Sequence, residues 1–200
     1  YMGECIMGEE RSILSLFETL IAVPSPSGRE EKVRGIIVDH LQTLGFDSET
    51  DPCGNVVVRL DGEQNEAPSM MFAAHMDEIA MVVTAVEPNG DLKVGPSGGL
   101  LPWKIGESPV EIVGDHETVV GVYSMGSAHR KKTEDCDVSW DGVKIITGLS
   151  PEALKEKGVR PGSCAVPERK VCGPYLFGDP ADPMIGAWTF DDRMGCAVLL

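Results

Sequence analysis

The sequence has little positive charge: 17 Lys and Arg stand against 32 Asp and Glu, for a formal net charge of -15. Nucleic acids and anionic membrane surfaces attract basic proteins, so we expect neither as a partner. No apolar run approaches the ~20 residues that span a bilayer. Residues 1–10 also lack a basic segment followed by an apolar run, so we predict no signal peptide.

The six cysteines lie apart, and no CxxC pair occurs among them. A cysteine-based zinc site is therefore not expected, and the chain is not a small cysteine-dense scaffold. We predict reduced thiols and a cytoplasmic location. The 42% hydrophobic and 24% charged content is ordinary for a globular protein and allows a sizeable core.

Helix signals come first along the chain. Apolar residues over 9–23 fall on one helical face, and the turn at 24–26 contains two prolines that end it. Ser27 and Glu30 form a capping-box pattern for a second helix, which Gly45 ends. The side chains expected to be buried on this helix are Val33, Ile36, Ile37, Leu41 and Leu44.

Strand signals follow. Residues 46–50 and 55–60 are predicted strands separated by a turn. Residues 69–75 form a short apolar run without alternation, which predicts a central strand covered on both faces. Two helices followed by such strands indicate an α/β layer.

The pattern changes after Asp77. Short β-rich runs alternate with clusters of Gly, Pro and Asn, which is typical of a small barrel or sandwich. One helix is expected here, with Ser150 as its N-cap and Gly158 at its end. The predicted strands are residues 79–86, 91–95, 109–113, 118–124 and 143–147.

The predicted fold class is therefore α/β with an inserted β-barrel-like domain. Residues 1–78 form the first part of the α/β domain, residues 79–180 the β-rich insertion, and residues 181–200 the return to the α/β domain. The last residues have the pattern of a buried helix that ends without a cap, so we expect the native chain to continue beyond Leu200.

His75 and Asp77 are separated by one residue at the end of a predicted strand, so their side chains share one side. Neutral imidazole is a common metal ligand, and a carboxylate on its other nitrogen fixes the tautomer. His75 is thus a candidate metal ligand that Asp77 would orient. A His-x-Asp sequence also arises by chance, and for this pair alone that alternative stays open.

Asp191 and Asp192 precede the last predicted helix. An aspartate at a helix start is a good N-cap and suits the helix dipole. Alternatively, one of the two carboxylates bridges two metal ions ~3.5–4 Å apart. The pair follows an apolar run at the presumed carboxyl end of a strand, where open α/β sheets place their sites.

Taken together, the motifs around His75-Met76-Asp77-Glu78-Ile79 and Phe190-Asp191-Asp192-Arg193-Met194-Gly195 resemble the family of cytosolic glutamyl and tetrahedral aminopeptidases, whose members are sometimes labelled endoglucanase M. Further family-like pieces occur in the expected order. They are Pro26-Ser27-Gly28-Arg29-Glu30-Glu31, Gly54-Asn55, Gly98-Gly99, Gly121-Val122 before His129, and Ser150-Pro151-Glu152-Ala153.

The resemblance implies a phosphorylase/hydrolase-like peptidase domain that carries the inserted barrel. It implies two divalent metal ions, zinc or cobalt, with His75 as a ligand to one and Asp191 as the bridging ligand. It also implies that Asp77 is the catalytic position that orients His75 and that the peptide bond before Asp192 is cis. Arg193 is interpreted as a structural ion-pair partner.

The implied function is the removal of N-terminal residues from peptides by a homo-oligomer, with dimers built through the β domain and assembled into a dodecamer. The family's glutamate general base follows the Asp-Asp motif and is absent from these 200 residues, so we expect this chain alone to be inactive. His129 could approach a neighbouring subunit, but a solvated loop histidine is the simpler interpretation. Two alternatives stay open: a two-metal deacylase of N-acyl amino acids, and a non-catalytic assembly protein.

Overall fold

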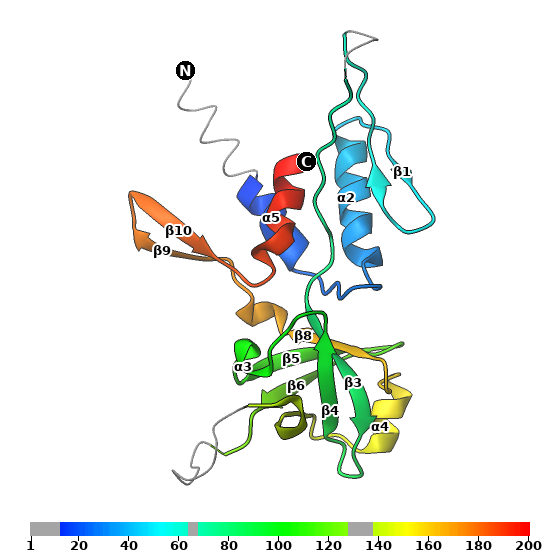
Figure 1. Cartoon of the computed structure of the whole chain (residues 1–200), viewed down its shortest axis with the longest axis vertical. Coiled ribbons are helices and arrows are strands. Elements are labelled where there is room, and N and C mark those ends of the chain that lie inside the picture. The colour runs from blue at the N-terminus through cyan, green and yellow to red at the C-terminus, as the bar shows by residue number, and fades with distance from the viewer. Residues whose placement is uncertain (1–12, 64–67, 128–137) are drawn as a thin grey trace. The chain divides into compact units, whose positions relative to one another are not determined.

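The structure is a computed structural model that describes residues 13–63, 68–127 and 138–200. The chain forms two compact units (Figure 1). Unit 1 comprises Tyr1–Glu78 and Pro174–Leu200, and unit 2 comprises Ile79–Gly173, so unit 2 is an insertion. The chain enters the insertion at the position expected from the sequence. It returns to unit 1 at Pro174, before the expected position of 181.

Helices form the core of unit 1. Residues 13–21 are helical, α2 spans Glu31–Thr43 and α5 spans Phe190–Leu199. The first and last of these helices are in contact through the aromatic rings of Phe17 and Phe190, whose centroids are 5.2 Å apart. The buried core residues of this unit are Phe17, Leu20, Ile21, Val33, Ile37, Leu41, Cys196 and Ala197.

The α2 helix ends as the sequence predicts. Gly45 has a φ of 83°, which a residue with a side chain rarely adopts. Its amide donates to the Gln42 carbonyl (3.0 Å), and the amide of Phe46 donates to the Leu41 carbonyl (2.9 Å). These two bonds form a Schellman motif. Leu44, expected on the buried face, lies at the C-cap beyond the last turn and is 47% exposed.

The predicted capping box at the start of α2 is wrong. The N-cap residue is Glu30, which makes no side-chain cap bond. Its carboxylate instead accepts from the amide of Gly28 at 2.6 Å. The Ser27 hydroxyl donates to the carboxylate of Asp77. A hydrogen bond to an ionised carboxylate is stronger than one between two neutral groups.

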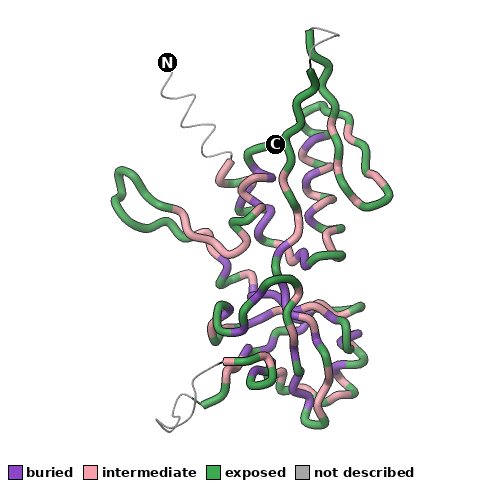
Figure 2. The backbone as a smooth tube through the Cα atoms, in the orientation of Figure 1, coloured by how far each residue is buried: buried purple, intermediate pink, exposed green. Residues whose placement is uncertain are grey.

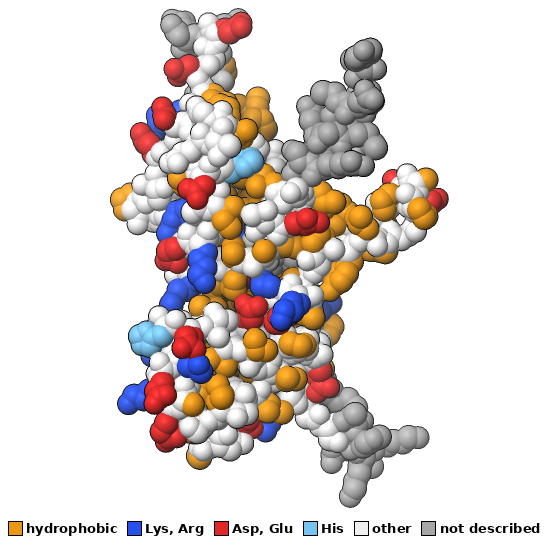
Figure 3. Space-filling model, turned by 180° about the vertical axis from the view of Figure 1, so that it is seen from behind, with side chains coloured by type: hydrophobic (Ala, Val, Ile, Leu, Met, Phe, Trp, Pro, Cys, Tyr) orange, Lys and Arg blue, Asp and Glu red, His pale blue; other side chains and the backbone are white. Residues whose placement is uncertain are grey.

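Two short hairpins complete unit 1. β1 (Glu49–Thr50) pairs antiparallel with β2 (Val56–Val57), within the predicted strands. β9 (Tyr175–Asp179) pairs antiparallel with β10 (Asp182–Gly186), a hairpin that the sequence did not indicate. Hydrophobic side chains gather on this second hairpin (Figure 3), where Tyr175, Leu176, Phe177 and Met184 are 53%, 59%, 51% and 58% exposed.

The predicted central strand at residues 69–75 is wrong for the described structure. This segment is extended but belongs to no sheet, and its backbone is largely exposed (Figure 2). Met70, Met71 and Phe72 are 80%, 88% and 72% exposed. A strand needs neighbouring strands to satisfy its backbone groups and to cover its side chains. Among the described residues, no strand pairs with the segment 69–75.

Unit 2 is a closed barrel with the strand order β3-β4-β7-β6-β5-β8, which confirms the predicted barrel insertion. The strands are β3 (Ala80–Val86), β4 (Leu92–Ser97), β5 (Ser108–Val113), β6 (Thr118–Ser124), β7 (Lys144–Ile146) and β8 (Cys164–Pro167). Side chains alternate between interior and exterior along β6, so that Val119, Gly121 and Tyr123 are buried. The interior includes Met81, Leu92, Val110, Ile112, Ile145 and Ala165.

Short helices complete unit 2. The helices α3 (Pro102–Ile105) and α4 (Pro151–Glu156) and the 3-10 turns η1 (Trp140–Gly142) and η2 (Arg169–Val171) connect the strands. The predicted cap of α4 is confirmed, because the Ser150 hydroxyl accepts from the Ala153 amide at 3.2 Å. Within the part of the chain that the structure describes, no helix has the length and apolar character needed to cross a membrane.

Gly121 is a test of the barrel packing. A Cβ at this position would lie 2.6 Å from Cγ2 of Ile145 and 3.1 Å from Cδ1 of Ile112. We expect Gly121→Ala to lower the free energy of unfolding by about 1–3 kcal/mol through overpacking. The control is Gly142→Ala, where the nearest atom is Ser139 Oγ at 3.9 Å. Urea denaturation of both variants measures the effect; equal stability of the two would contradict the barrel geometry.

Candidate metal centre

The His75 imidazole lies between two carboxylates from distant parts of the sequence. Its Nδ1 is 2.9 Å from Oδ1 of Asp77, and its Nε2 is 3.0 Å from Oδ1 of Asp191. Asp77 therefore contacts one ring nitrogen, as the sequence predicts, while the other nitrogen faces Asp191. The three candidate residues are brought together, with 56% of the His75 side chain and 94% of the Asp191 side chain exposed.

The two aspartates in the first turn of α5, where the backbone φ/ψ angles are not helical, have different contacts. Oδ1 of Asp192 accepts from the Gly195 amide at 3.1 Å, so Asp192 caps the regular part of α5 that follows it. Its Oδ2 lies 3.4 Å from the His75 amide. A Cβ on Gly195 would lie 2.2 Å from the capping oxygen, which explains glycine there. The peptide bond between Asp191 and Asp192 is cis, as the resemblance implied.

The charges around His75 alter its protonation. Partial burial, the largest single influence, lowers the pKa of His75, but the hydrogen bonds and charges of Asp191 and Asp77 outweigh it. The pKa of His75 is therefore above its ordinary value of 6.5. The hydrogen bond from Ser27 is the main reason that the pKa of Asp77 is lowered. A metal ion that binds Nε2 must displace a proton held there.

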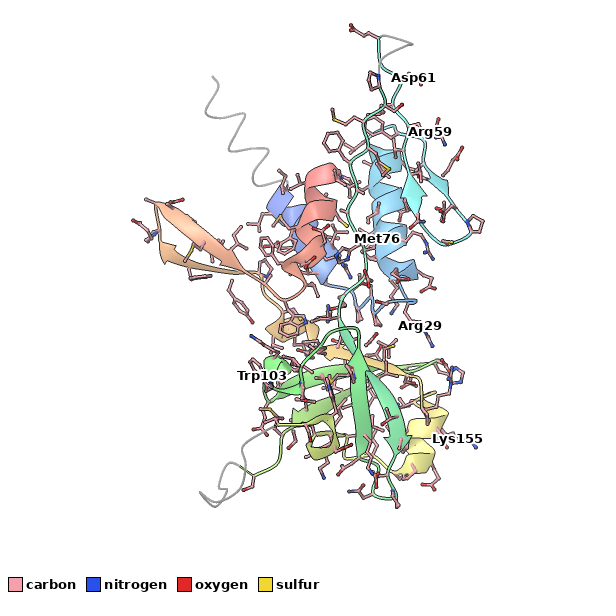
Figure 4. The ribbon with its side chains drawn as sticks, in the orientation of Figure 1. Arg29, Arg59, Asp61, Met76, Trp103 and Lys155 are labelled. Atoms are coloured by element: carbon pink, nitrogen blue, oxygen red, sulfur yellow. The ribbon has the colours of Figure 1, made fainter. Side chains whose placement is uncertain are left out.

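A buried network connects the His75 segment to the helices. Ser25 is fully buried, and its hydroxyl donates to the Met76 carbonyl at 2.9 Å. Its amide donates to the Glu78 carboxylate at 2.8 Å, and its carbonyl accepts from the Glu78 amide at 3.0 Å. Met76 lies beside α2 and packs against the core of unit 1 (Figure 4).

Arg193 joins this network from α5. Its side chain is fully buried and donates both to the Leu20 carbonyl and to the Ser25 hydroxyl. These contacts are hydrogen bonds, and the ion pair expected for Arg193 stays a prediction. Because Arg193 follows Asp191 closely and Ser25 holds Met76, the network links the two segments that carry the candidate ligands.

The residues present fit a metal ion. Two donor atoms on one tetrahedral zinc lie about 3.3 Å apart, because Zn–N and Zn–O bonds are ~2.0–2.2 Å long. Nε2 of His75 and Oδ1 of Asp191 are 3.0 Å apart. Cys196 is nearby, but burial raises the pKa of its thiol to about 11, and its Sγ lies 3.3 Å from the His75 carbonyl as a donor. His75 and Asp191 are therefore the candidate ligands.

A complete metal site is not formed by these residues. Over residues 13–63, 68–127 and 138–200, no three His, Cys, Asp or Glu side chains gather in a cluster suited to a metal ion. His129 lies outside the described residues, and its predicted solvated position stays a prediction. The contacts of Ser25 and Ser27 were missed by the sequence prediction. The sequence feature that could have indicated these contacts is the presence of two serines in or next to the turn that contains Pro24 and Pro26.

Two solved structures that are similar to this chain are named as peptidases. An aminopeptidase from the archaeon Desulfurococcus kamchatkensis superposes with a TM-score of 0.79 at 28% identity, covering 96% of this chain and 51% of that one. The TET1 peptidase of Pyrococcus horikoshii, described as able to assemble into a tetrahedron or a large octahedral shell, gives a TM-score of 0.75 at 25% identity, over 94% and 54% of the two chains. This chain therefore shares its fold with these two peptidases.

Residues 54–200 match the sequence model of the M42 glutamyl aminopeptidases, and the chain belongs to this family. The lysyl aminopeptidase of Pyrococcus furiosus is 30% identical over 174 residues, which cover 80% of this chain and 49% of that protein. The chain thus spans about half the length of the curated relatives it matches.

Removal of Arg193 tests the network behind the site. We expect Arg193→Met to lower the free energy of unfolding by about 2–5 kcal/mol, because it leaves the Leu20 carbonyl and the Ser25 hydroxyl buried without this donor. Arg59→Met is the matched control at an exposed position of unit 1 and should change stability by less than about 0.5 kcal/mol. Thermal and urea denaturation measure both; an Arg193 variant as stable as the control would contradict the network.

Proposed function

We propose that the full-length protein is a metal-dependent aminopeptidase that removes N-terminal residues from peptides in the cytoplasm. The observation that carries this proposal is the 3.0 Å approach of His75 Nε2 to Asp191 Oδ1 in a chain of the M42 family. The names of the similar proteins, lysyl aminopeptidase and aminopeptidase, support the same reaction.

His75 and Asp191 would hold two divalent ions, zinc or cobalt, with His75 bound to one and Asp191 shared by both. When bound, such ions lower the pKa of a water molecule and polarise the scissile carbonyl. The Asp191 carboxylate is well placed to be shared because its side chain is 94% exposed. Asp77 contacts Nδ1 of the imidazole and would so direct Nε2 to the ion.

The remaining ligands and the general base would come from residues outside this sequence. The described residues supply a histidine and a carboxylate to the site without a third ligand group. We therefore expect the 200-residue chain alone to show no turnover. The full-length protein is the appropriate subject for the experiments below.

Substitution of the ligands tests the proposed function. His75→Ala and Asp191→Ala should each reduce hydrolysis of aminoacyl p-nitroanilides to background and lower the metal content per chain, because each removes one bond to the ions. Asp77→Ala should reduce kcat/KM by about 10- to 100-fold, since it removes only the orienting contact. Enzyme kinetics and elemental analysis of the purified protein measure these effects.

His116→Ala is the matched control, at an exposed position of unit 2, and should leave turnover unchanged. Retained turnover in His75→Ala would refute the ligand assignment. If the protein hydrolysed N-acyl amino acids and not aminoacyl substrates, the proposed function would be wrong and the deacylase alternative would hold. Metal-free protein with no hydrolysis of either class would favour the non-catalytic alternative.

The full-length protein is also proposed to be a homo-oligomer built through unit 2, with a dodecamer as the expected assembly. An apolar row crosses the outer face of the barrel, where Val122 pairs with Pro109 on one side and Ile146 on the other. Val122 is 49% exposed and Ile146 42% exposed. Pro109, Val122 and Ile146 line an open hollow of about 430 Å³.

A charge in this row tests the oligomer. We expect Val122→Glu to convert the assembly to smaller species, because an interface that buries this carboxylate would pay its desolvation cost. Light scattering coupled to size-exclusion chromatography measures the mass. Thr118→Glu, at an exposed end of the same strand, is the control and should keep the wild-type mass. A monomeric wild type, or an unchanged Val122→Glu variant, would contradict the proposed interface.

A further inference from the structure

Ser27 contacts the carboxylate that orients the candidate metal ligand. Its hydroxyl donates to Oδ2 of Asp77, while Oδ1 of the same carboxylate lies 2.9 Å from Nδ1 of His75. Both oxygens of Asp77 are thus engaged from different directions. A carboxylate held at two points has a fixed plane, and the imidazole bonded to it has a fixed orientation.

The backbone holds Ser27 in this position. Pro26 and Glu78 form a parallel β-bridge, which sets the turn that contains Ser27 beside the segment that contains Asp77. The hydrogen bonds between Ser25 and Glu78 reinforce the same register. The proximity of Ser27 to Asp77 therefore follows from the packing of two segments and does not depend on one side-chain rotamer.

The Ser27 hydroxyl has no part in the structure of the following helix. The amide of Gly28 is satisfied by the Glu30 carboxylate, and the N-cap of α2 is Glu30. A nucleophilic role is disfavoured as well, because an activated serine hydroxyl donates to a base such as histidine. Here the hydroxyl donates to Asp77, and the two His75 nitrogens face Asp77 and Asp191.

We propose that Ser27 is a positioning residue of the metal centre: its hydroxyl fixes the Asp77 carboxylate, which in turn holds His75 with Nε2 directed toward Asp191. This inference rests on the proposed function, because it assigns Ser27 a role in metal binding. Groups that orient a metal-binding histidine at one remove typically change metal affinity or activity by about 10- to 100-fold. Ser27 acts one bond further out, so the lower end of this range applies.

The test is a double-mutant cycle on the full-length protein, with zinc affinity measured by competition with a chelator. Ser27→Ala should weaken zinc binding by about 10-fold. Ser27→Thr keeps the hydroxyl and should restore most of the affinity. In the Asp77→Ala background, Ser27→Ala should have no further effect, because Ser27 acts through Asp77. Ser139→Ala, at an exposed position of unit 2, is the matched control and should bind zinc as the wild type does.

The outcomes separate this inference from the proposed function. If the wild type binds zinc and Ser27→Ala binds it with the same affinity, the role of Ser27 is overturned and the proposed function stands. An equal loss in the wild-type and Asp77→Ala backgrounds also overturns it, since Ser27 would then act independently of Asp77. A wild-type protein that binds no zinc or cobalt refutes the proposed function, and this inference with it. Equal melting temperatures of the Ser27 and Ser139 variants exclude a general loss of folding as the cause.

Discussion

The buried guanidinium of Arg193 connects the two segments that carry the candidate site. It donates to the Leu20 carbonyl and to the Ser25 hydroxyl, and Ser25 in turn binds Met76. His75 and Asp191 are separated by 116 positions, with the whole barrel between them. Their approach therefore depends on tertiary contacts. A buried charge is stable only when hydrogen-bonded, so the contacts that stabilise Arg193 also hold the ligands together.

Local signals in the sequence were enough to predict much of the barrel. The β6 strand coincides with a predicted run because alternation of buried and exposed side chains can be recognised within a single strand. The α4 helix begins directly after its predicted N-cap, Ser150. The predicted strand at residues 69–75 depended on distant residues and was wrong. The run at 69–75 has the composition of a buried strand, but burial requires neighbours that the described residues do not provide. The short β8 strand closes the barrel through pairing with β3 and β5, which its own sequence does not encode.

The site shows the same division. Residue types and the family resemblance identified His75, Asp77 and Asp191, but the sequence pattern alone left capping and metal binding open for the aspartate pair. In the structure Asp192 caps the regular part of α5 that follows it, and Asp191 faces the imidazole. The prediction for Ser27 was wrong because a capping-box pattern is local, whereas its acceptor lies fifty positions away in the chain.

Shared coordination of one cation by His75 and Asp191 is the central claim. Anomalous diffraction from crystals of the full-length protein grown with zinc, recorded on both sides of the zinc absorption edge, tests it directly. We expect an anomalous peak about 2 Å from Nε2 of His75 and from a carboxylate oxygen of Asp191. Zinc bound elsewhere, with these two side chains still hydrogen-bonded to each other, would contradict the claim.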